Sequence, residues 1–271
     1  MSNSRQKEAE NNRQEKYDQS CNASRIPFRQ HGVRNNRQEN MIKVVTLQHI
    51  YGKNRERMTD LLKTLVENEL KDLEVKVEIS ITSENWAEFS LEGEDEEISA
   101  NFLISRYGTP AVKAEAGKKY LGFLQAFGED AFLVNIGIPV KVETEELKAL
   151  GSGKPKQLAS RFGLIPHLPV EIEVFEANKK VKARFTKKQL VIWWNWKKAS
   201  TDRVIVNAAT RSEIKSAIKK TGHGRDIYEI ERLGLLEHAI VCRENTDGPG
   251  IVAAIGPRLK SEMGVVIGDA R

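Results

Sequence analysis

A strict alternation of apolar and other residues over 73–81 is the feature that most constrains the fold of this chain. Successive side chains of a strand point to opposite faces, so the pattern predicts a strand with one buried face. The segment before it, 53–71, places leucines and a valine at helical spacing instead. A one-faced strand that follows directly on such a helix predicts a sheet with helices packed against it. The alternating apolar residues are Leu73, Val75, Val77, Ile79 and Ile81.

The chain divides into four segments by residue pattern. Residues 1–40 are rich in Asn, Gln and Arg and have almost no apolar periodicity, so they predict a disordered polar tail. The strand pattern begins abruptly at Met41, which leaves a mis-assigned start of translation as the alternative. Segment 41–115 predicts an α/β sandwich domain. Its expected elements are strands 41–50, 73–82 and 86–92 and helices 53–71 and 96–107.

Short strands separated by glycine turns predict a small OB-like β-barrel over 116–177. The glycines and aromatics of 122–137 resemble the S-one-type OB-fold of RNA-binding proteins. That resemblance implies that Phe127 and Phe132 stack on bases, and the alternative is that both are ordinary barrel core. The expected strands are 120–127, 131–137, 138–142 and 170–175, with an insert of helical character over 143–162.

Residues 178–271 predict a basic α/β domain, which makes the whole chain an α+β protein. Each element is short and is bounded by turn residues. The expected elements are helices 187–198, 212–220 and 250–263 and strands 203–206, 237–242 and 264–267.

Positive charge is concentrated in residues 177–225, which hold fourteen Lys and Arg against two acidic residues, interleaved with aromatics. Cations neutralise phosphates and flat side chains stack on bases, so this composition indicates an RNA-binding surface. Trp196 is the predicted stacking tryptophan, because it is rotated away from the face that Trp193 and Trp194 share. The predicted phosphate-binding residues are Lys179, Lys180, Lys182, Lys187, Lys188, Lys197, Lys198, Lys219, Lys220, His223 and Arg225.

Two glycine turns are candidate anion sites. Gly222 and Gly224 let backbone N–H groups converge beside Lys219, Lys220 and Arg225, and helix capping by Gly222 is the alternative. The second turn resembles the start of an ACT regulatory domain, in which such a helix N-terminus binds small ligands. The other function to weigh is therefore a small-molecule-binding regulator or enzyme that uses 222–226 and 247–250 as an anion pocket. The residues of the second turn are Asp247, Gly248, Pro249 and Gly250.

Other function classes find little support in the sequence. His223 and His238 lack a spacing that demands a catalytic partner, so no catalytic residue, metal or cofactor is predicted. Cys21 and Cys242 are too few and too far apart for a disulfide framework, and no run is apolar enough for a membrane span. A cytoplasmic location is expected. The acidic run Glu92–Glu97 is expected to be solvated, and a protein partner that binds through it is a further reading.

Several long motifs resemble an archaeal family that is catalogued only as a domain of unknown function. The resemblance extends over 41–271 and implies an archaeal cytoplasm but no reaction. We therefore expect a non-catalytic RNA-binding factor in translation or RNA processing, with ribosomal RNA as one candidate target. The motifs are Pro155–Leu164, Asp202–Arg211, Ala217–His238 and Thr246–Gly250.

Overall fold

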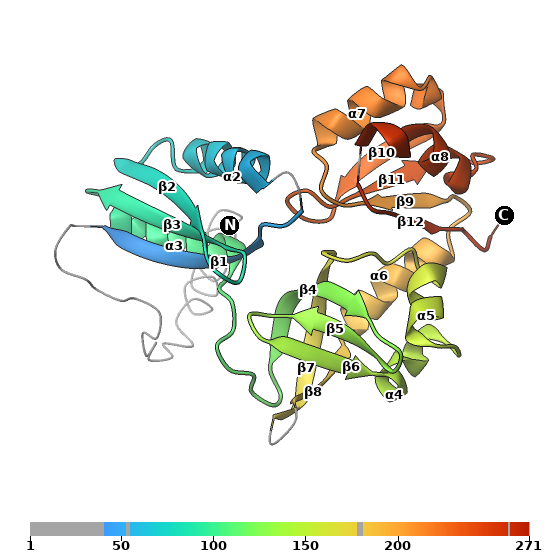
Figure 1. Cartoon of the computed structure of the whole chain (residues 1–271), viewed down its shortest axis with the longest axis horizontal. Coiled ribbons are helices and arrows are strands. Elements are labelled where there is room, and N and C mark those ends of the chain that lie inside the picture. Colours follow the sequence, from blue (N-terminus) through green and yellow to red (C-terminus); the bar gives the residue numbers. More distant parts are fainter. Residues whose placement is uncertain (1–40, 53–54, 178–180, 260, 271) are drawn as a thin grey trace, which may run out of the picture. The chain divides into compact units, whose positions relative to one another are not determined.

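The computed structural model describes residues 41–52, 55–177, 181–259 and 261–270. The tail predicted over 1–40 lies outside these residues. The expected fold class is confirmed, because sheets with helices flank a closed barrel in the central part of the chain (Figure 1).

The N-terminal domain is a sheet in the order β1-β3-β2 with two helices. Apolar residues of both helices, such as Leu62 and Leu103, share one buried cluster with Val77 and Phe89 of the sheet. The alternation over 73–81 therefore marks a strand that buries one face against helices, as the sequence predicts. The elements are β1 (Ile42–His49), α2 (Arg55–Glu69), β2 (Val75–Ile81), β3 (Trp86–Gly93) and α3 (Glu96–Tyr107).

The central domain is a closed barrel in the order β4-β5-β6-β8-β7. Its β8 lies beyond residue 177, the expected end of this domain, because the barrel closes only when β8 pairs with β6 and β7. The insert 143–162 is helical, as expected. The strands are β4 (Lys119–Phe127), β5 (Ala131–Asn135), β6 (Pro139–Glu143), β7 (Pro169–Ala177) and β8 (Val181–Phe185); the helices are α4 (Thr144–Leu147), η1 (Lys148–Leu150), α5 (Pro155–Arg161) and α6 (Lys187–Lys197).

The C-terminal domain is an antiparallel sheet in the order β10-β11-β9-β12, built from a βαββαβ chain order (Figure 1). The final strand expected near 264–267 is β12, and it pairs with β9. Helices α7 and α8 pack on one face through a buried cluster that includes Ile214, Ile251 and Ile240. The elements are β9 (Arg203–Val206), α7 (Arg211–Lys220), η2 (His223–Arg225), β10 (Ile227–Arg232), β11 (His238–Cys242), α8 (Gly248–Leu259) and β12 (Met263–Val266).

The opposite face of this sheet is also covered. Ile205, Ala239 and Val266 are fully buried and belong to the same cluster as the barrel core. At Gly264 the backbones of β12 and of the turn after α5 approach so closely that a Cβ would lie 2.2 Å from the carbonyl oxygen of Gly163. Burial on both faces explains why β11 reads as a continuous apolar run instead of an alternating one. This leaves the helix α7, the turn after it and the edge strand β10 to carry exposed functional groups.

None of the helices in the described ranges combines the length and the apolar character that a membrane span needs.

Candidate nucleic-acid interface

Helix α7 presents a row of cations to solvent. Arg211, Lys215 and Lys219 are exposed and follow one another at intervals of four residues, which places them on one helical face. The opposite face is buried through Ile214 and Ala217. The apolar face therefore fixes the helix on the sheet and points the cations outward.

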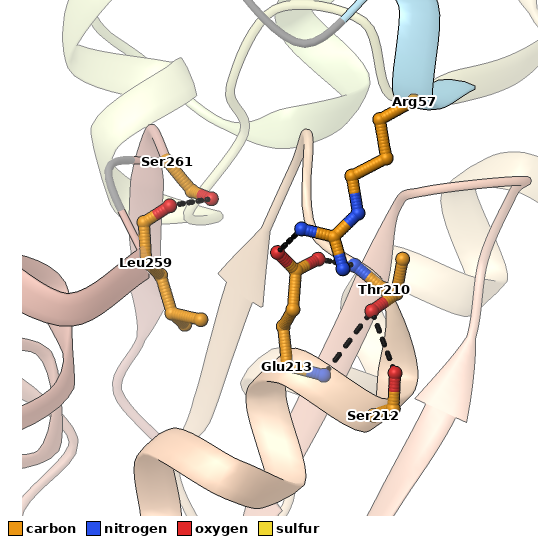
Figure 2. A network of polar contacts seen from close by, with 6 residues as sticks. All are labelled: Arg57, Thr210, Ser212, Glu213, Leu259 and Ser261. Atoms are coloured by element: carbon orange, nitrogen blue, oxygen red, sulfur yellow. Dashed lines mark hydrogen bonds and ion pairs between the residues drawn. The ribbon is translucent and has the colours of Figure 1, made fainter. Parts of the chain in front are cut away.

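The first turn of α7 is held by a capping box, shown in Figure 2. The Thr210 hydroxyl accepts a hydrogen bond from the Glu213 N–H (3.1 Å), and the Glu213 carboxylate accepts one from the Thr210 N–H (2.8 Å). The same carboxylate pairs with Arg57 of α2. Glu213 is the only acidic residue of 211–225, and these partners engage it within the first turn.

The turn after α7 continues the basic surface. Gly222 adopts the left-handed conformation (φ +82°) that ends the helix, which a side chain would strain. The short helix η2 then brings Arg225 to the surface, while the His223 ring is hydrogen bonded to Asp226 (Nδ1 to Oδ2, 2.7 Å). The turn therefore caps the helix and adds one exposed arginine, with the histidine already engaged.

Strand β10 contributes an exposed aromatic ring. The pairing of β10 with β11 passes from Ile227 opposite Cys242 to Glu229 opposite Val241, so Tyr228 is the extra residue of a β-bulge. Its side chain is 67% exposed, which is unusual for a strand aromatic. The bulge aims this ring out of the sheet edge.

These elements enclose a basic groove of about 700 Å³. Four of its residues are exposed cations, and no carboxylate in the described part of the chain forms an ion pair with any of them. With Glu229 also in its lining, the groove therefore carries a net positive charge beside an aromatic ring. Its lining is Arg211, Lys215, Ile218, Lys219, Gly222, Gly224, Arg225, Ile227, Tyr228, Glu229 and Ile230.

The structure separates the predicted phosphate-binding lysines into two groups. Lys219 and Arg225 line the groove, and Lys220 is exposed on the same turn of α7. The lysines of β8 and α6 do not line the groove. Lys182 pairs with Glu176 (2.8 Å), and Lys197 is only 14% exposed and pairs with Asp269 (2.6 Å).

The remaining predicted lysines differ in their surroundings. Lys187 and Lys188 are exposed at the start of α6. The Lys198 ammonium lies 5.7 Å from the centre of the Trp194 ring. Lys179 and Lys180 lie outside the described residues. Phosphate contacts by the exposed lysines of α6 stay a prediction.

The predicted stacking residues are mostly core. Phe132 has no exposed surface and Trp196 is 8% exposed, so neither can present a ring face to a base. Phe132 packs edge to face against Phe185 inside the barrel. Phe127 is half-buried and packs edge to face against Phe132. Phe132 is thus used for packing. Among the described aromatic residues the most exposed is Tyr228 on β10, followed by Phe175 on β7 at 39%.

The two glycine turns differ in their surroundings. The groove is lined by Gly222 and Gly224 but by no residue of 247–250. At the second turn the Gly250 N–H donates to Asp247 Oδ2 (2.7 Å) and the Gly248 N–H donates to Asp202 Oδ2 (2.9 Å). Two carboxylates therefore already accept hydrogen bonds from amides at the start of α8, and an anion pocket formed by both turns stays a prediction.

Sequence reasoning missed Arg211, Lys215 and Tyr228. The four-residue spacing of the cations was a usable signal, because it marks one helical face. The bulge at Tyr228 gave no such signal, because it arises from the register in which β10 pairs with β11. The acidic run Glu92–Glu97 spans the end of β3 and the start of α3, and a partner for it stays a prediction.

A second polar cluster joins the N-terminal and C-terminal domains. The Tyr51 hydroxyl donates a hydrogen bond to the buried Glu237 carboxylate and accepts one from the Ala208 N–H (3.2 Å). The Tyr51 ring stacks on His167, with 3.7 Å between ring centres. Burial raises the pKa of Glu237 to about 7 and lowers the pKa of His167 to about 4. This cluster is a buried, closely packed joint.

The other histidines also look structural. Burial lowers the pKa of His238, which lies in fully buried β11. In the described ranges no group of three or more His, Cys, Asp or Glu is arranged to hold a metal ion.

Three family models match the chain in succession. The DUF2110 N-terminal domain matches residues 43–113, the DUF2110 central domain matches 114–197, and the DUF2110 C-terminal domain matches 201–267. The chain therefore belongs to the DUF2110 family, whose function is unknown, as the sequence motifs indicated. No curated protein matches the chain.

Proposed function

We propose that this member of the DUF2110 family binds RNA through the basic groove of its C-terminal domain. The observation that carries the proposal is the placement of four cations around one exposed tyrosine ring, none of them paired with a carboxylate of the described residues. Lysine and arginine supply the electrostatic part of nucleic-acid affinity, and an exposed ring supplies a surface on which a base stacks.

Ion pairing supports this site over the other basic residues. Lys182 and Lys197 already neutralise Glu176 and Asp269, so a phosphate would have to compete with a carboxylate for them. Lys215, Lys219 and Arg225 have no such competitor among the described residues, so they gain more from a phosphate. A negatively charged backbone is therefore expected to contact the cations of α7 in preference to Lys182 and Lys197.

The exposed ring supports a nucleic acid over a simple anion. A single phosphate needs cations or backbone N–H groups but no aromatic surface. Tyr228 keeps two thirds of its surface in solvent although burial of a ring of that size is favourable. Base stacking gives this exposure a use.

The test is the binding of the full chain to fluorescently labelled RNA over several salt concentrations. Replacing Lys215, Lys219 and Arg225 together by Ala is expected to weaken binding and to flatten the dependence of log K on log salt by about 0.7 per lost phosphate contact on single-stranded RNA. Tyr228→Ala is expected to weaken binding by about 1–3 kcal/mol with little change of that slope.

The matched control removes the same charge elsewhere. Lys63, Lys76 and Lys118 each pair with a nearby carboxylate, and their triple alanine variant is expected to bind RNA as the wild type does. Equal effects of the two triple variants would show that net charge alone governs binding. Absence of RNA binding by the wild type at low salt would refute the proposal.

A further inference from the structure

We infer that the RNA bound at the groove is single-stranded and that a second hollow beyond Tyr228 holds the phosphate on the other side of the stacked base. The inference rests on the proposed function and adds a ligand class and a second subsite to it. The second hollow has a volume of about 570 Å³. Its lining is Thr201, Arg203, Tyr228, Glu229, Val241, Cys242, Arg243 and Glu244.

The two hollows meet at the bulge of β10. Only Tyr228 and Glu229 line both of them. The groove is bounded by α7. The second hollow is bounded by three residues that lie side by side across the sheet, Glu229 of β10, Val241 of β11 and Arg203 of β9. A strand of nucleic acid that lies in the groove and continues into the second hollow must therefore cross the sheet edge at the tyrosine ring.

Arg203 gives the second hollow its binding chemistry. Its side chain is 16% exposed, and its Nε and Nη1 atoms are buried and donate to no acceptor in the described residues. Its one ion pair is a long contact between Nη2 and the Glu231 carboxylate (3.8 Å). Buried donors are costly when they lack an acceptor, so a shift of the Arg203 side chain toward a phosphate in the hollow is favourable. A guanidinium group suits the two oxygens of a phosphate.

Arg243 completes the subsite from the exposed side. Its guanidinium carbon lies 5.9 Å from the centre of the Tyr228 ring. A base stacked on this ring would therefore have an arginine beside it, close enough for its neighbouring phosphate. One side of the ring then has Lys219 and Arg225, and the other has Arg203 and Arg243.

The charge balance of the second hollow limits which phosphate ligands it can bind. Glu229 and Glu244 line it together with the two arginines, so its formal charges cancel. A nucleoside triphosphate brings several negative charges and would be repelled by these carboxylates. One phosphodiester brings a single charge, so the two carboxylates repel it less while an arginine still pairs with it.

The exposed ring excludes a duplex. Inside a double-stranded RNA both faces of each base are covered by neighbouring bases, so away from the helix ends a tyrosine can stack only on an unpaired base. The ligand is therefore a single strand with at least two consecutive phosphodiesters, one on each side of the stacked base.

The test uses a trinucleotide with 2-aminopurine between two uridines, whose fluorescence reports stacking on Tyr228. In two further probes a neutral methylphosphonate replaces one linkage or the other. Each replacement is expected to weaken binding to the wild type by about tenfold. Arg243→Ala is expected to weaken the unmodified probe by a similar factor and to abolish the effect of one replacement. Lys219→Ala is expected to abolish the effect of the other.

Arg203→Lys is the second variant, because it keeps the charge and loses the planar fork. It is expected to weaken the binding of the unmodified probe by about fivefold while the protein stays folded. The matched control is Arg258→Ala, an exposed arginine of α8 that lines neither hollow. It is expected to leave binding unchanged.

The outcomes separate the two proposals. If the wild type binds no RNA, the proposed function fails and this inference fails with it. If groove variants weaken binding of longer RNA but Arg243→Ala and Arg203→Lys bind the trinucleotide as the wild type does, only the second subsite is refuted. If a blunt duplex binds as tightly as a single strand of the same length, the assignment to single-stranded RNA is refuted.

Discussion

The N-terminal and C-terminal domains repeat one chain order, strand, helix, strand, strand, helix. Their sheets also correspond, because β1-β3-β2 and β9-β11-β10 have the same order. The C-terminal domain adds β12 beside β9. In the N-terminal domain β1 has only β3 as a neighbour among the described strands.

The surfaces of the two domains differ more than their folds do. Residues 41–112 hold fourteen acidic residues against eight Lys and Arg, and cations such as Lys63 and Lys76 pair with carboxylates. Residues 211–225 hold five Lys and Arg against one Glu. The N-terminal domain is thus net acidic and pairs cations with carboxylates, whereas the stretch 211–225 of the C-terminal domain is net basic. Function has to be argued from the site and not from the fold.

The largest predicted effect concerns the joint between the two domains and its pH dependence. Burial raises the pKa of Glu237 to about 7 in the folded protein, above its usual value of 4.5. The folded state therefore holds this proton more tightly, and the stability it provides is lost as pH rises toward and through 7. The free energy of unfolding, measured with urea, is expected to fall by about 3 kcal/mol between pH 4.5 and pH 8 from this group.

Glu237→Gln is expected to remove that pH dependence. His167 provides a separate window, because its pKa is lowered to about 4 and its contribution is lost as pH falls below 6.5 through 4. His167→Asn is therefore expected to change the pH dependence of the free energy of unfolding only below about pH 6.5. Identical pH profiles of the wild type and Glu237→Gln would show that folding does not raise the pKa of Glu237.

The second effect contrasts the charges of the two domains. Reversal of Lys215 and Lys219 to Glu is expected to weaken RNA binding about a hundredfold at 0.1 M salt, about 2.7 kcal/mol, because two phosphate contacts become two repulsions. Reversal of Lys63 and Lys76 is the control and is expected to have at most a small effect, measured by fluorescence anisotropy. Equal losses from the two pairs would remove the distinction between the domains.

The third effect contrasts the helix starts of the two domains. Thr210 accepts a hydrogen bond from the Glu213 N–H, whereas Asp95, which precedes α3, makes no side-chain hydrogen bond to its helix. Thr210→Ala is expected to lower the free energy of unfolding by about 1 kcal/mol. Asp95→Ala removes no capping bond, but it removes the hydrogen bond that Asp95 Oδ2 accepts from the Glu74 N–H (2.8 Å). Urea unfolding decides, and no loss from Thr210→Ala would contradict the capping argument.

The smallest effect is expected at the ion pair between the domains. Arg57 is 54% exposed and its partner Glu213 is 30% exposed, so water and salt screen their attraction. Arg57→Ala is expected to lower the free energy of unfolding by less than about 0.5 kcal/mol at physiological salt. The same measurement in 0.5 M NaCl is expected to show no difference. A loss that persists at high salt would mean that Arg57 contributes through packing and not through charge.

Local pattern was sufficient for most of the secondary structure. The expected strand at 73–81, the helix at 96–107 and the final strand near 264–267 correspond to β2, α3 and β12. Periodicity reports which side of an element is buried, and that information is contained in neighbouring residues. The concentration of cations before residue 225 is likewise a property of the chain alone.

Long-range pairing was needed for the rest. The sequence does not show that β8 closes the barrel, because this requires β6 and β7 to meet a strand from beyond the expected domain boundary. Nor does it separate Phe132, which fills the barrel, from Tyr228, which a bulge aims outward. Both are aromatic residues in strands with similar neighbours in the chain.

By itself, the sequence determined the α+β class, the approximate places of the elements and the basic character of residues 177–225. Only the tertiary structure decided which cations are neutralised by carboxylates and which aromatic ring reaches solvent. The reason is physical: burial and ion pairing depend on atoms that are far apart along the chain. Lys182 and Lys215 are both basic residues of one basic segment, yet among the described residues only Lys182 pairs with a carboxylate.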